Sequence, residues 1–229
     1  MAMQLDNVVP FGRSFDEYVT MFNLTATDLG QPILSVADGP ASFNAEGTSL
    51  GHRIQSVDPL YCYQARDIKQ RFDAVVDNIM TQIENTPDDW VWSYHHSPSD
   101  LRKNRENAIQ KFCQDFGQGK AEGRYEVGSF PQLTYPDASY NLGLCSHFLF
   151  LYSEQFDRTF HLDSICEMLR ICREVRIFPL LTLNLQPSPH LDFVLESLTK
   201  LGCQWEIQPV AYELQRNGNK MLKITKCRC

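Results

Sequence analysis

The stretch from Ile33 to Asp58 constrains the fold more than any other part of the sequence. It contains, in order, a β-prone run over 33–37, a tight turn at Asp38-Gly39-Pro40, a helical segment over 43–50 closed by Gly51, and a second β-prone run over 53–57. A strand, a tight turn, a helix and a second strand in so short a span form the βαβ unit of an open parallel sheet. The pattern therefore predicts an α/β fold.

The alternation of helical and strand patterns continues to the end of the chain. Helices are expected over 15–23, 65–83, 161–172 and 188–201, the last with Ser188 as N-cap and Pro189 at its first position. Further strands are expected over 124–127, 140–148, 175–181, 204–212 and 220–225. The last two flank Asn217-Gly218, a pair typical of an antiparallel hairpin. We therefore expect a doubly wound, mostly parallel seven-stranded sheet with helices on both faces and a C-terminal antiparallel hairpin.

Residues 1–229 are expected to form a single domain with two additions to this plan. Residues 1–30 would form an N-terminal helical strap, in which Ser14 and Glu17 have the spacing of a capping box. Residues 84–123 would form a helical insertion, which begins with the Trp-rich segment over 90–96 and continues as a helix that Ser97 can cap. The aromatic side chains of this segment could wall a ligand pocket or fix the insertion to the main body.

Composition and charge limit the class of partner. The formal net charge is -7 and no cluster of Lys and Arg stands out, which argues against binding to a nucleic-acid backbone. Residues 1–10 lack a secretory pattern, and the apolar runs are too short for a membrane span. The eight cysteines form no Cys-x-x-Cys pair, and Cys227 and Cys229 give only weak support for a metal site. We expect a cytoplasmic protein with reduced thiols, no metal and no membrane or nucleic-acid partner, with its oligomeric state left open.

Two segments resemble known cofactor motifs. Residues 33–43 read Ile-Leu-Ser-Val-Ala-Asp-Gly-Pro-Ala-Ser-Phe, and the string over 136–140 reads Pro-Asp-Ala-Ser-Tyr. The first resembles the first cofactor motif of the class I, Rossmann-like S-adenosylmethionine-dependent methyltransferases. The second resembles the Pro-Asp-Gly-Ser-Phe string before the fourth strand of that family. The resemblance covers roughly residues 30–60 and 124–227 and implies S-adenosyl-L-methionine as the cofactor.

The resemblance places a cofactor site at Asp38, Gly39, Pro40, Ser42 and Asp58. Gly39 can adopt a positive φ and let backbone N–H groups approach a ligand closely. The helix after this turn directs its positive end toward the methionine part of the cofactor. Asp58 stands where the family has the acid that grips the ribose, and a carboxylate can accept two hydrogen bonds from a vicinal diol. An ordinary tight turn and an exposed Asp-Pro turn are the structural alternatives.

Further contacts are implied around this centre. Aligning the family string backwards puts Ser129 and Phe130 at the turn that contacts adenine. Cys145 and Ser146 lie at the carboxyl end of the predicted fourth strand, where open parallel sheets hold their ligands. Arg13, before the first helix, could meet the carboxylate of the cofactor or remain in solvent.

His147, directly after these residues, is the candidate catalytic residue. It could accept a proton from an amine or hydroxyl acceptor as the methyl group arrives. Alternatively, the imidazole lines the pocket without a chemical role. Because methyl transfer from a sulfonium depends mainly on in-line positioning, activity does not require a base.

These observations predict methyl transfer from S-adenosylmethionine to a small-molecule acceptor, since the chain has no separate domain for recognising a polymer. Ser35, Ser129 and Asn141 stand where the family commonly has acids, and Gly39 is the only glycine of its turn. These departures motivate one alternative, a catalytically inactive S-adenosylmethionine-binding protein. A nicotinamide enzyme is a second alternative, although the G-x-G-x-x-G turn of dinucleotide sites is missing.

Overall fold

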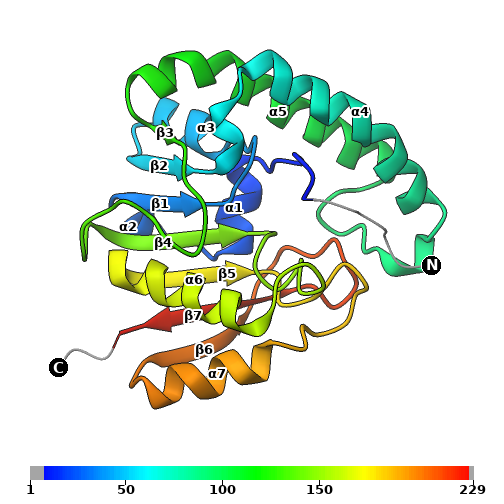
Figure 1. The fold of residues 1–229 in the computed structure, drawn as a ribbon. Coiled ribbons are helices and arrows are strands. Elements are labelled where there is room, and N and C mark those ends of the chain that lie inside the picture. Colours follow the sequence, from blue (N-terminus) through cyan, green and yellow to red (C-terminus); the bar gives the residue numbers. More distant parts are fainter. Residues whose placement is uncertain (1–7, 227–229) are drawn as a thin grey trace.

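A computed structural model describes residues 8–226, and its centre is a seven-stranded sheet in the order β3-β2-β1-β4-β5-β7-β6 (Figure 1). The strands are β1 (Ile33–Val36), β2 (Ile54–Val57), β3 (Tyr125–Glu126), β4 (Tyr140–Ser146), β5 (Cys172–Phe178), β6 (Gln204–Pro209) and β7 (Lys220–Thr225). The pairs within β1 to β5 are parallel, whereas β7 is antiparallel to both β5 and β6. The predicted sheet and its C-terminal antiparallel pair are confirmed.

The strand order reverses between β1 and β4, and this position matters for function. Ile33 of β1 pairs with Ile54 of β2 on one side and with Leu142 of β4 on the other. The chain therefore winds outward from β1 in both directions. In such sheets ligands bind in the crevice outside the carboxyl ends of the strands at the reversal point.

Helices cover both faces of the sheet. They are α1 (Phe15–Met21), α2 (Ala26–Leu29), α3 (Phe43–Ser49), α4 (Ala65–Glu84), α5 (Pro98–Ala121), α6 (Arg158–Ile171) and α7 (Leu191–Lys200), with short 3-10 turns η1 (Pro59–Cys62) and η2 (Pro87–Asp89). Successive strand residues point to opposite faces, so Ile33 joins the buried cluster of α1, α3, α4 and α5, and Leu34 joins that of α6 and α7. Burial on both faces explains the apolar β1 sequence.

Several expected boundaries differ from the observed ones, among them the end of β6 at Pro209 instead of 212 and the start of α6 at Arg158 instead of 161, and two others have a clear local cause. β5 spans Cys172–Phe178 and not 175–181, because α6 runs directly into it and Pro179, which has no N–H to donate, follows its last residue. α7 begins at Leu191 with His190 as N-cap, not after Ser188. The Ser188 hydroxyl instead lies 2.7 Å from that of Ser153 and accepts a hydrogen bond from His190 N at 3.2 Å, which forms a turn before the helix.

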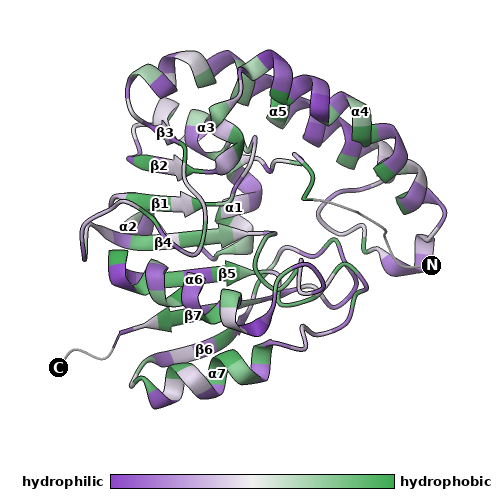
Figure 2. Ribbon diagram, viewed as in Figure 1, coloured by the Kyte–Doolittle hydropathy of each residue, from purple (hydrophilic) through white to green (hydrophobic). Residues whose placement is uncertain are grey.

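The connection between β2 and β3 contains the segment interpreted as an insertion. Here α4 packs along α5, and α5 contacts α3 and β3. Ser97 caps α5 by accepting a hydrogen bond from Asp100 N at 3.1 Å, as predicted. Both helices carry hydrophobic and hydrophilic residues in turn along their length (Figure 2). Their buried hydrophobic side chains belong mainly to the cluster shared by α1, α3, α4 and α5.

Residues 8–14 of the expected N-terminal strap lie against the turn that follows β1, and residues 1–7 lie outside the described structure. Ser14 and Glu17 form the predicted capping box of α1. Ser42 N donates a hydrogen bond to the Arg13 carbonyl at 3.0 Å. A Cβ atom on Gly12 would lie 2.2 Å from the Pro40 carbonyl oxygen, so only glycine permits this approach. The strap over residues 8–14 is therefore fixed on the turn by backbone contact.

Other features bear on partners. No helix between residues 8 and 226 combines the length and apolar character that a membrane span requires. Within the same stretch no disulfide joins the cysteines, and no group of three or more His, Cys, Asp or Glu side chains is placed to hold a metal ion. Cys227 and Cys229 lie outside the described residues.

We predict that Gly12→Ala lowers the free energy of unfolding by about 1–3 kcal/mol, because the added methyl group forces the strap away from the Pro40 carbonyl. Urea denaturation measures the change. Gly117→Ala is the control, since a Cβ atom there meets nothing within 4 Å and the residue lies inside the C-terminal part of α5. The control should gain about 0.5–1 kcal/mol. Equal stability of Gly12→Ala and the parent chain would contradict the backbone contact.

Candidate active site

The turn after β1 has an unusual backbone conformation. Ala37 and Gly39 both have positive φ values, 58° and 52°. A positive φ at a non-glycine residue costs on the order of 1 kcal/mol, and such strain concentrates at functional sites. The turn thus keeps two left-handed residues although only one is glycine. The space beside Gly39 is open, since a Cβ atom there would meet nothing within 4 Å.

Asp58, at the carboxyl end of β2, holds this turn from the side. Its Oδ2 accepts a hydrogen bond from Gly39 N at 2.9 Å, and its Oδ1 accepts one from Leu60 N at 2.7 Å. Burial raises the pKa of the carboxyl to about 6, against the lowering effect of these two backbone hydrogen bonds. Each carboxylate oxygen has a further lone pair, so Asp58 can still accept hydrogen bonds from a ligand.

Asp38 faces into the protein more than toward a ligand. Its carboxyl group accepts hydrogen bonds from Ser56 Oγ at 2.9 Å and from the Tyr61 hydroxyl at 3.0 Å. The same Tyr61 hydroxyl also lies 2.7 Å from the Gly39 carbonyl oxygen, and its single proton cannot serve both acceptors. If Asp38 carries a proton, its carboxyl group donates to the Tyr61 hydroxyl, and the Tyr61 proton is then free to bond to the Gly39 carbonyl oxygen. Burial and the neighbouring Asp58 raise the pKa of Asp38 to about 8. We infer that Asp38 is largely neutral at pH 7 and locks the turn.

His147 follows β4 and has a positive φ of 54°. Its backbone N donates a hydrogen bond to the Phe178 carbonyl at 2.6 Å, and its Nδ1 lies 2.9 Å from Ser146 Oγ. Burial and the charges of Arg13 and Arg105 hold the pKa of His147 well below its usual range. The imidazole is therefore neutral at pH 7.

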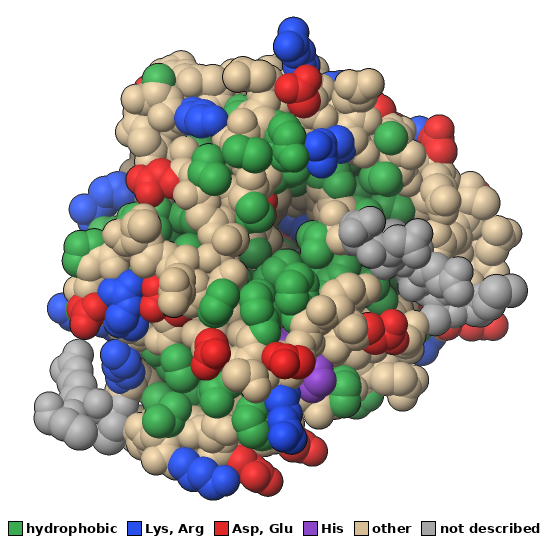
Figure 3. Space-filling view, in the orientation of Figure 1, with side chains coloured by type: hydrophobic (Ala, Val, Ile, Leu, Met, Phe, Trp, Pro, Cys, Tyr) green, Lys and Arg blue, Asp and Glu red, His purple; other side chains and the backbone are tan. Residues whose placement is uncertain are grey.

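Two hollows meet at this edge of the sheet. The outer cleft, of ≈ 640 Å³, is lined by Asp38, Gly39, Asp58, Ser146, Tyr63 and Arg71, among others. The inner cavity, of ≈ 70 Å³, is lined mainly by apolar and aromatic side chains, among them Ile79, Trp90, Leu101, Tyr152 and Tyr212. Val9, Phe11, Arg13 and His147 line both. Figure 3 shows hydrophobic side chains around a hollow near the centre of this face.

The other residues expected in the site do not line either hollow. Pro40 and Ser42 contact the strap, and the Ser42 hydroxyl donates a hydrogen bond to Glu46 at 2.6 Å. Ser129 forms an isolated bridge with Gln132. Buried positions in the α6 and α7 cluster are taken by Phe130 and Cys145.

Sequence reasoning missed part of the outer cleft. Tyr63, after η1, and Arg71, on α4, stack with 4.0 Å between the guanidinium carbon and the ring centroid. Leu60 lines the same cleft. The available signal was the position of Leu60 and Tyr63 directly after Asp58, because residues that follow a parallel strand border the crevice.

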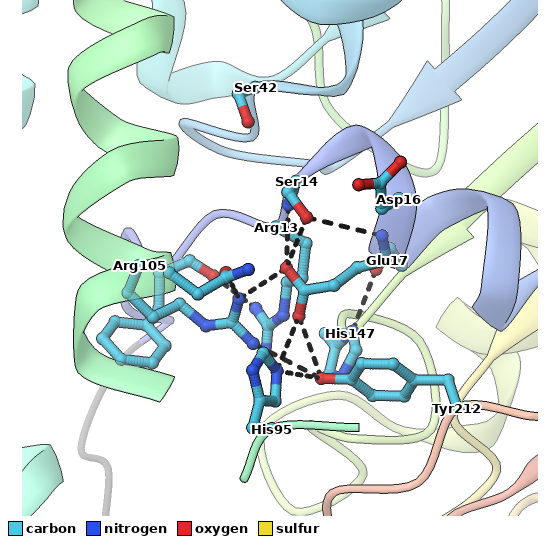
Figure 4. A network of polar contacts seen from close by, with 12 residues as sticks. Arg13, Ser14, Asp16, Glu17, Ser42, His95, Arg105, His147 and Tyr212 are labelled. Atoms are coloured by element: carbon cyan, nitrogen blue, oxygen red, sulfur yellow. Dashed lines mark hydrogen bonds and ion pairs between the residues drawn. The ribbon is translucent and has the colours of Figure 1, made fainter. Parts of the chain in front are cut away.

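A network of buried polar groups lies beside the inner cavity (Figure 4). Glu17 accepts hydrogen bonds from Arg105 Nη1 at 2.7 Å and from the Tyr212 hydroxyl at 3.0 Å, and His95 Nε2 lies 3.2 Å from its Oε1. Burial alone would raise the pKa of Glu17, yet Arg105 and His95 lower it well below its usual value. The network joins α1, α5, the Trp-rich segment and the loop after β6.

The Trp-rich segment borders the site and is also packed against the main body. Trp90 lines the inner cavity, while its Nε1 donates a hydrogen bond to Thr86 Oγ1 at 2.9 Å. Tyr94 packs on Tyr212 with ring centroids 4.8 Å apart. The aromatic side chains therefore fix this segment to the main body, and Trp90 also lines the inner cavity.

We predict that Arg105→Met lowers the free energy of unfolding by about 3–5 kcal/mol, because it leaves the Glu17 carboxylate buried without its cation. Urea denaturation measures the loss. The double variant Glu17→Gln/Arg105→Met should lose less, since no charge is then stranded. Arg102→Met is the matched control on α5, where the exposed pairs with Asp77 and Glu106 contribute less than about 1 kcal/mol. A loss for Arg105→Met no larger than for this control would contradict the role of the network.

A second prediction concerns Asp38. A carboxyl whose pKa is raised by folding, here to about 8, holds its proton more tightly in the folded state. Its contribution to stability therefore falls as pH rises from about 4 toward 8. Asp38→Asn removes this dependence, so its stability relative to the parent should rise by at least about 1.4 kcal/mol between pH 5 and pH 8.5. Denaturation curves at the two pH values test this, and parallel pH profiles for the two proteins would refute it.

The chain has a relative of nearly equal length. It is 32% identical over 225 residues to the uncharacterized protein MJ0045 of Methanocaldococcus jannaschii. The aligned residues make up 98% of this chain and 99% of that protein. This chain belongs to the family of MJ0045. No family model matches the chain. Membership in the MJ0045 family is thus a relation over the whole sequence, the Trp-rich segment included.

Comparison with solved structures shows which fold the chain has. The mitomycin 7-O-methyltransferase MmcR aligns with a TM-score of 0.50 at 12% identity, covering 93% of this chain and 54% of MmcR. The magnesium protoporphyrin IX methyltransferase ChlM of Synechocystis PCC 6803, solved with bound S-adenosylmethionine, aligns with a TM-score of 0.46 at 10% identity over 86% of this chain and 71% of ChlM. At these identities the likeness is one of fold. The chain has the class I, Rossmann-like methyltransferase fold.

Proposed function

We propose that the chain binds S-adenosylmethionine in the outer cleft and transfers its methyl group to a small-molecule acceptor. The position of Asp58 supports this proposal most strongly. Its carboxylate borders the cleft at the carboxyl end of β2 and holds Gly39 of the neighbouring turn at 2.9 Å. This is where open α/β sheets bind nucleoside ligands, with an acid on the ribose hydroxyls.

The residues of the outer cleft fit such a ligand. Asp58 has free lone pairs for two vicinal hydroxyls, and the open space beside Gly39 lets a ligand approach the backbone of the turn. Ala37 and His147, which follow β1 and β4, line the cleft and have the positive φ values that often mark functional sites. Asp38 and Tyr61 hold the turn from behind.

The chemistry of transfer needs few protein groups. When bound, S-adenosylmethionine supplies an electrophilic methyl group on a positively charged sulfur. A heteroatom of the acceptor forms the new bond to the methyl carbon, while the carbon–sulfur bond breaks and its electron pair stays on sulfur. A neutral His147, which borders both hollows, can accept the proton that an O–H or N–H acceptor releases. The rest of the rate enhancement would come from holding the acceptor atom in line with the methyl group.

Calorimetric titration with S-adenosylmethionine and S-adenosylhomocysteine tests binding. We expect Asp58→Ala to weaken both by roughly 10- to 100-fold, because hydrogen bonds to a charged group contribute about 1.5–3 kcal/mol. Asp163→Ala, an exposed change on α6, should bind like the parent chain. Failure of the parent to bind, or tighter binding of NADH, would refute the proposal. Incubation with methyl-labelled cofactor and a small-molecule extract then tests transfer, and binding without labelled product would identify a binding protein.

The pKa of Asp58 adds a pH dependence to the same experiment. Because the ionised carboxyl accepts the ribose hydrogen bonds and its pKa is about 6, affinity should fall as pH decreases below 6. Asp58→Asn should bind weakly and without this fall. An unchanged affinity of the parent chain between pH 5 and pH 8 would contradict the role of the carboxylate.

A further inference from the structure

Arg13 is a cation of the site without a carboxylate partner in the described structure. Its Nη1 donates a hydrogen bond to the Phe11 carbonyl oxygen, and its Nε is buried without a hydrogen-bond partner. Glu17, the buried carboxylate nearby, pairs with Arg105 at 2.7 Å instead. Burial and the charge of Arg105 lower the pKa of Arg13 to about 10. Arg13, Arg105 and Glu17 thus leave an excess of positive charge beside the inner cavity.

The Arg13 side chain is directed toward the inner cavity. Figure 4 shows it extending beside Arg105 and His147, away from the turn that carries Ser42. The charges that act on it most include those of Arg105, Tyr212, Glu17 and Tyr152, and Tyr212 and Tyr152 line the inner cavity. Although Arg13 lines both hollows, an anion in the inner cavity can therefore neutralise this guanidinium.

The remaining walls of the inner cavity set the size and polarity of its ligand. Most of its lining side chains are apolar or aromatic, including Ile79, Leu101 and Trp90. Its volume of ≈ 70 Å³ is about half that of a cavity that holds benzene, roughly 150 Å³. A compact body of few atoms fills such a space. His147 connects it to the outer cleft, so a ligand there faces the cofactor.

We propose that the inner cavity is the acceptor site and that its ligand is a short carboxylate whose anion pairs with Arg13 and whose second heteroatom, an O–H or N–H group, takes the methyl group while His147 accepts the released proton. The inference rests on the proposed methyl transfer and adds the class of acceptor. It replaces the expectation that Arg13 binds the carboxylate of the cofactor. A bidentate guanidinium–carboxylate pair satisfies the unpartnered Nε and balances the excess charge.

The test uses short carboxylates and their neutral amides as probes. Protein saturated with S-adenosylhomocysteine is titrated with propionate and butyrate, and separately with propionamide and butyramide. We expect the carboxylates to bind at least tenfold more tightly. Arg13→Gln should remove this preference, and Arg13→Lys, which keeps the charge, should retain most of it. Arg53→Gln, which removes an exposed cation at the opposite end of β2, is the control and should bind like the parent.

Each remaining outcome separates the two proposals. Equal binding of carboxylates and amides to the parent chain would overturn the inference and leave cofactor binding intact. Arg13→Gln could instead weaken S-adenosylhomocysteine more than threefold while leaving methylthioadenosine, which lacks the carboxylate, unaffected. That result would assign Arg13 to the cofactor and overturn the inference. If S-adenosylhomocysteine fails to bind the parent, the proposed function falls, and the same probe series on the unliganded protein decides whether Arg13 selects anions.

Discussion

The buried carboxylate of Glu17 is the point on which the arrangement of the site depends. It caps the first helix through Ser14 and at the same time receives Arg105 from α5 and Tyr212 from the loop after β6. A charge at such a depth is tolerated only because its partners satisfy it. Its partners come from segments far apart in the sequence. One carboxylate therefore links α1, α5 and the loop after β6 to one another. Residues 8–14, α5 and the loop after β6 form part of the wall of the inner cavity, together with α4 and the segments that follow β4 and β5.

The acid pair at the strand ends shows a division of labour that burial produces. Asp38 and Asp58 follow neighbouring strands, yet one is held by side chains from behind and the other by backbone amides at the cleft. The first is kept largely neutral at pH 7, with its pKa near 8, while the second ionises with a pKa of about 6. A single charge is thus presented to the ligand. The inward acid compensates for a turn with few glycines by fixing it through Tyr61.

Much of the fold was available from the sequence. Period and turn signals locate the strands because each is short, apolar and followed by a turn residue, and the Asn217-Gly218 pair indicates the terminal hairpin. The strand-end rule likewise placed Asp58 and His147 at the crevice. Ser129, Phe130 and Cys145 do not line the hollows, a placement that a linear motif does not reveal because it does not show which face a side chain takes. Glu17 and Arg105 could not be paired, since their contact depends on the packing of α5 against α1.

The position of residues 8–14 between the two hollows has a consequence for ligand binding. Val9, Phe11 and Arg13 border both hollows, so a ligand in either one contacts the same short segment. Any shift of this segment that one ligand favours would change the contacts that the segment offers to the other ligand. By thermodynamic linkage each ligand must then change the affinity of the other by the same factor. Residues 8–14 would thus couple the two proposed ligands, with Arg13 as a direct contact of one of them.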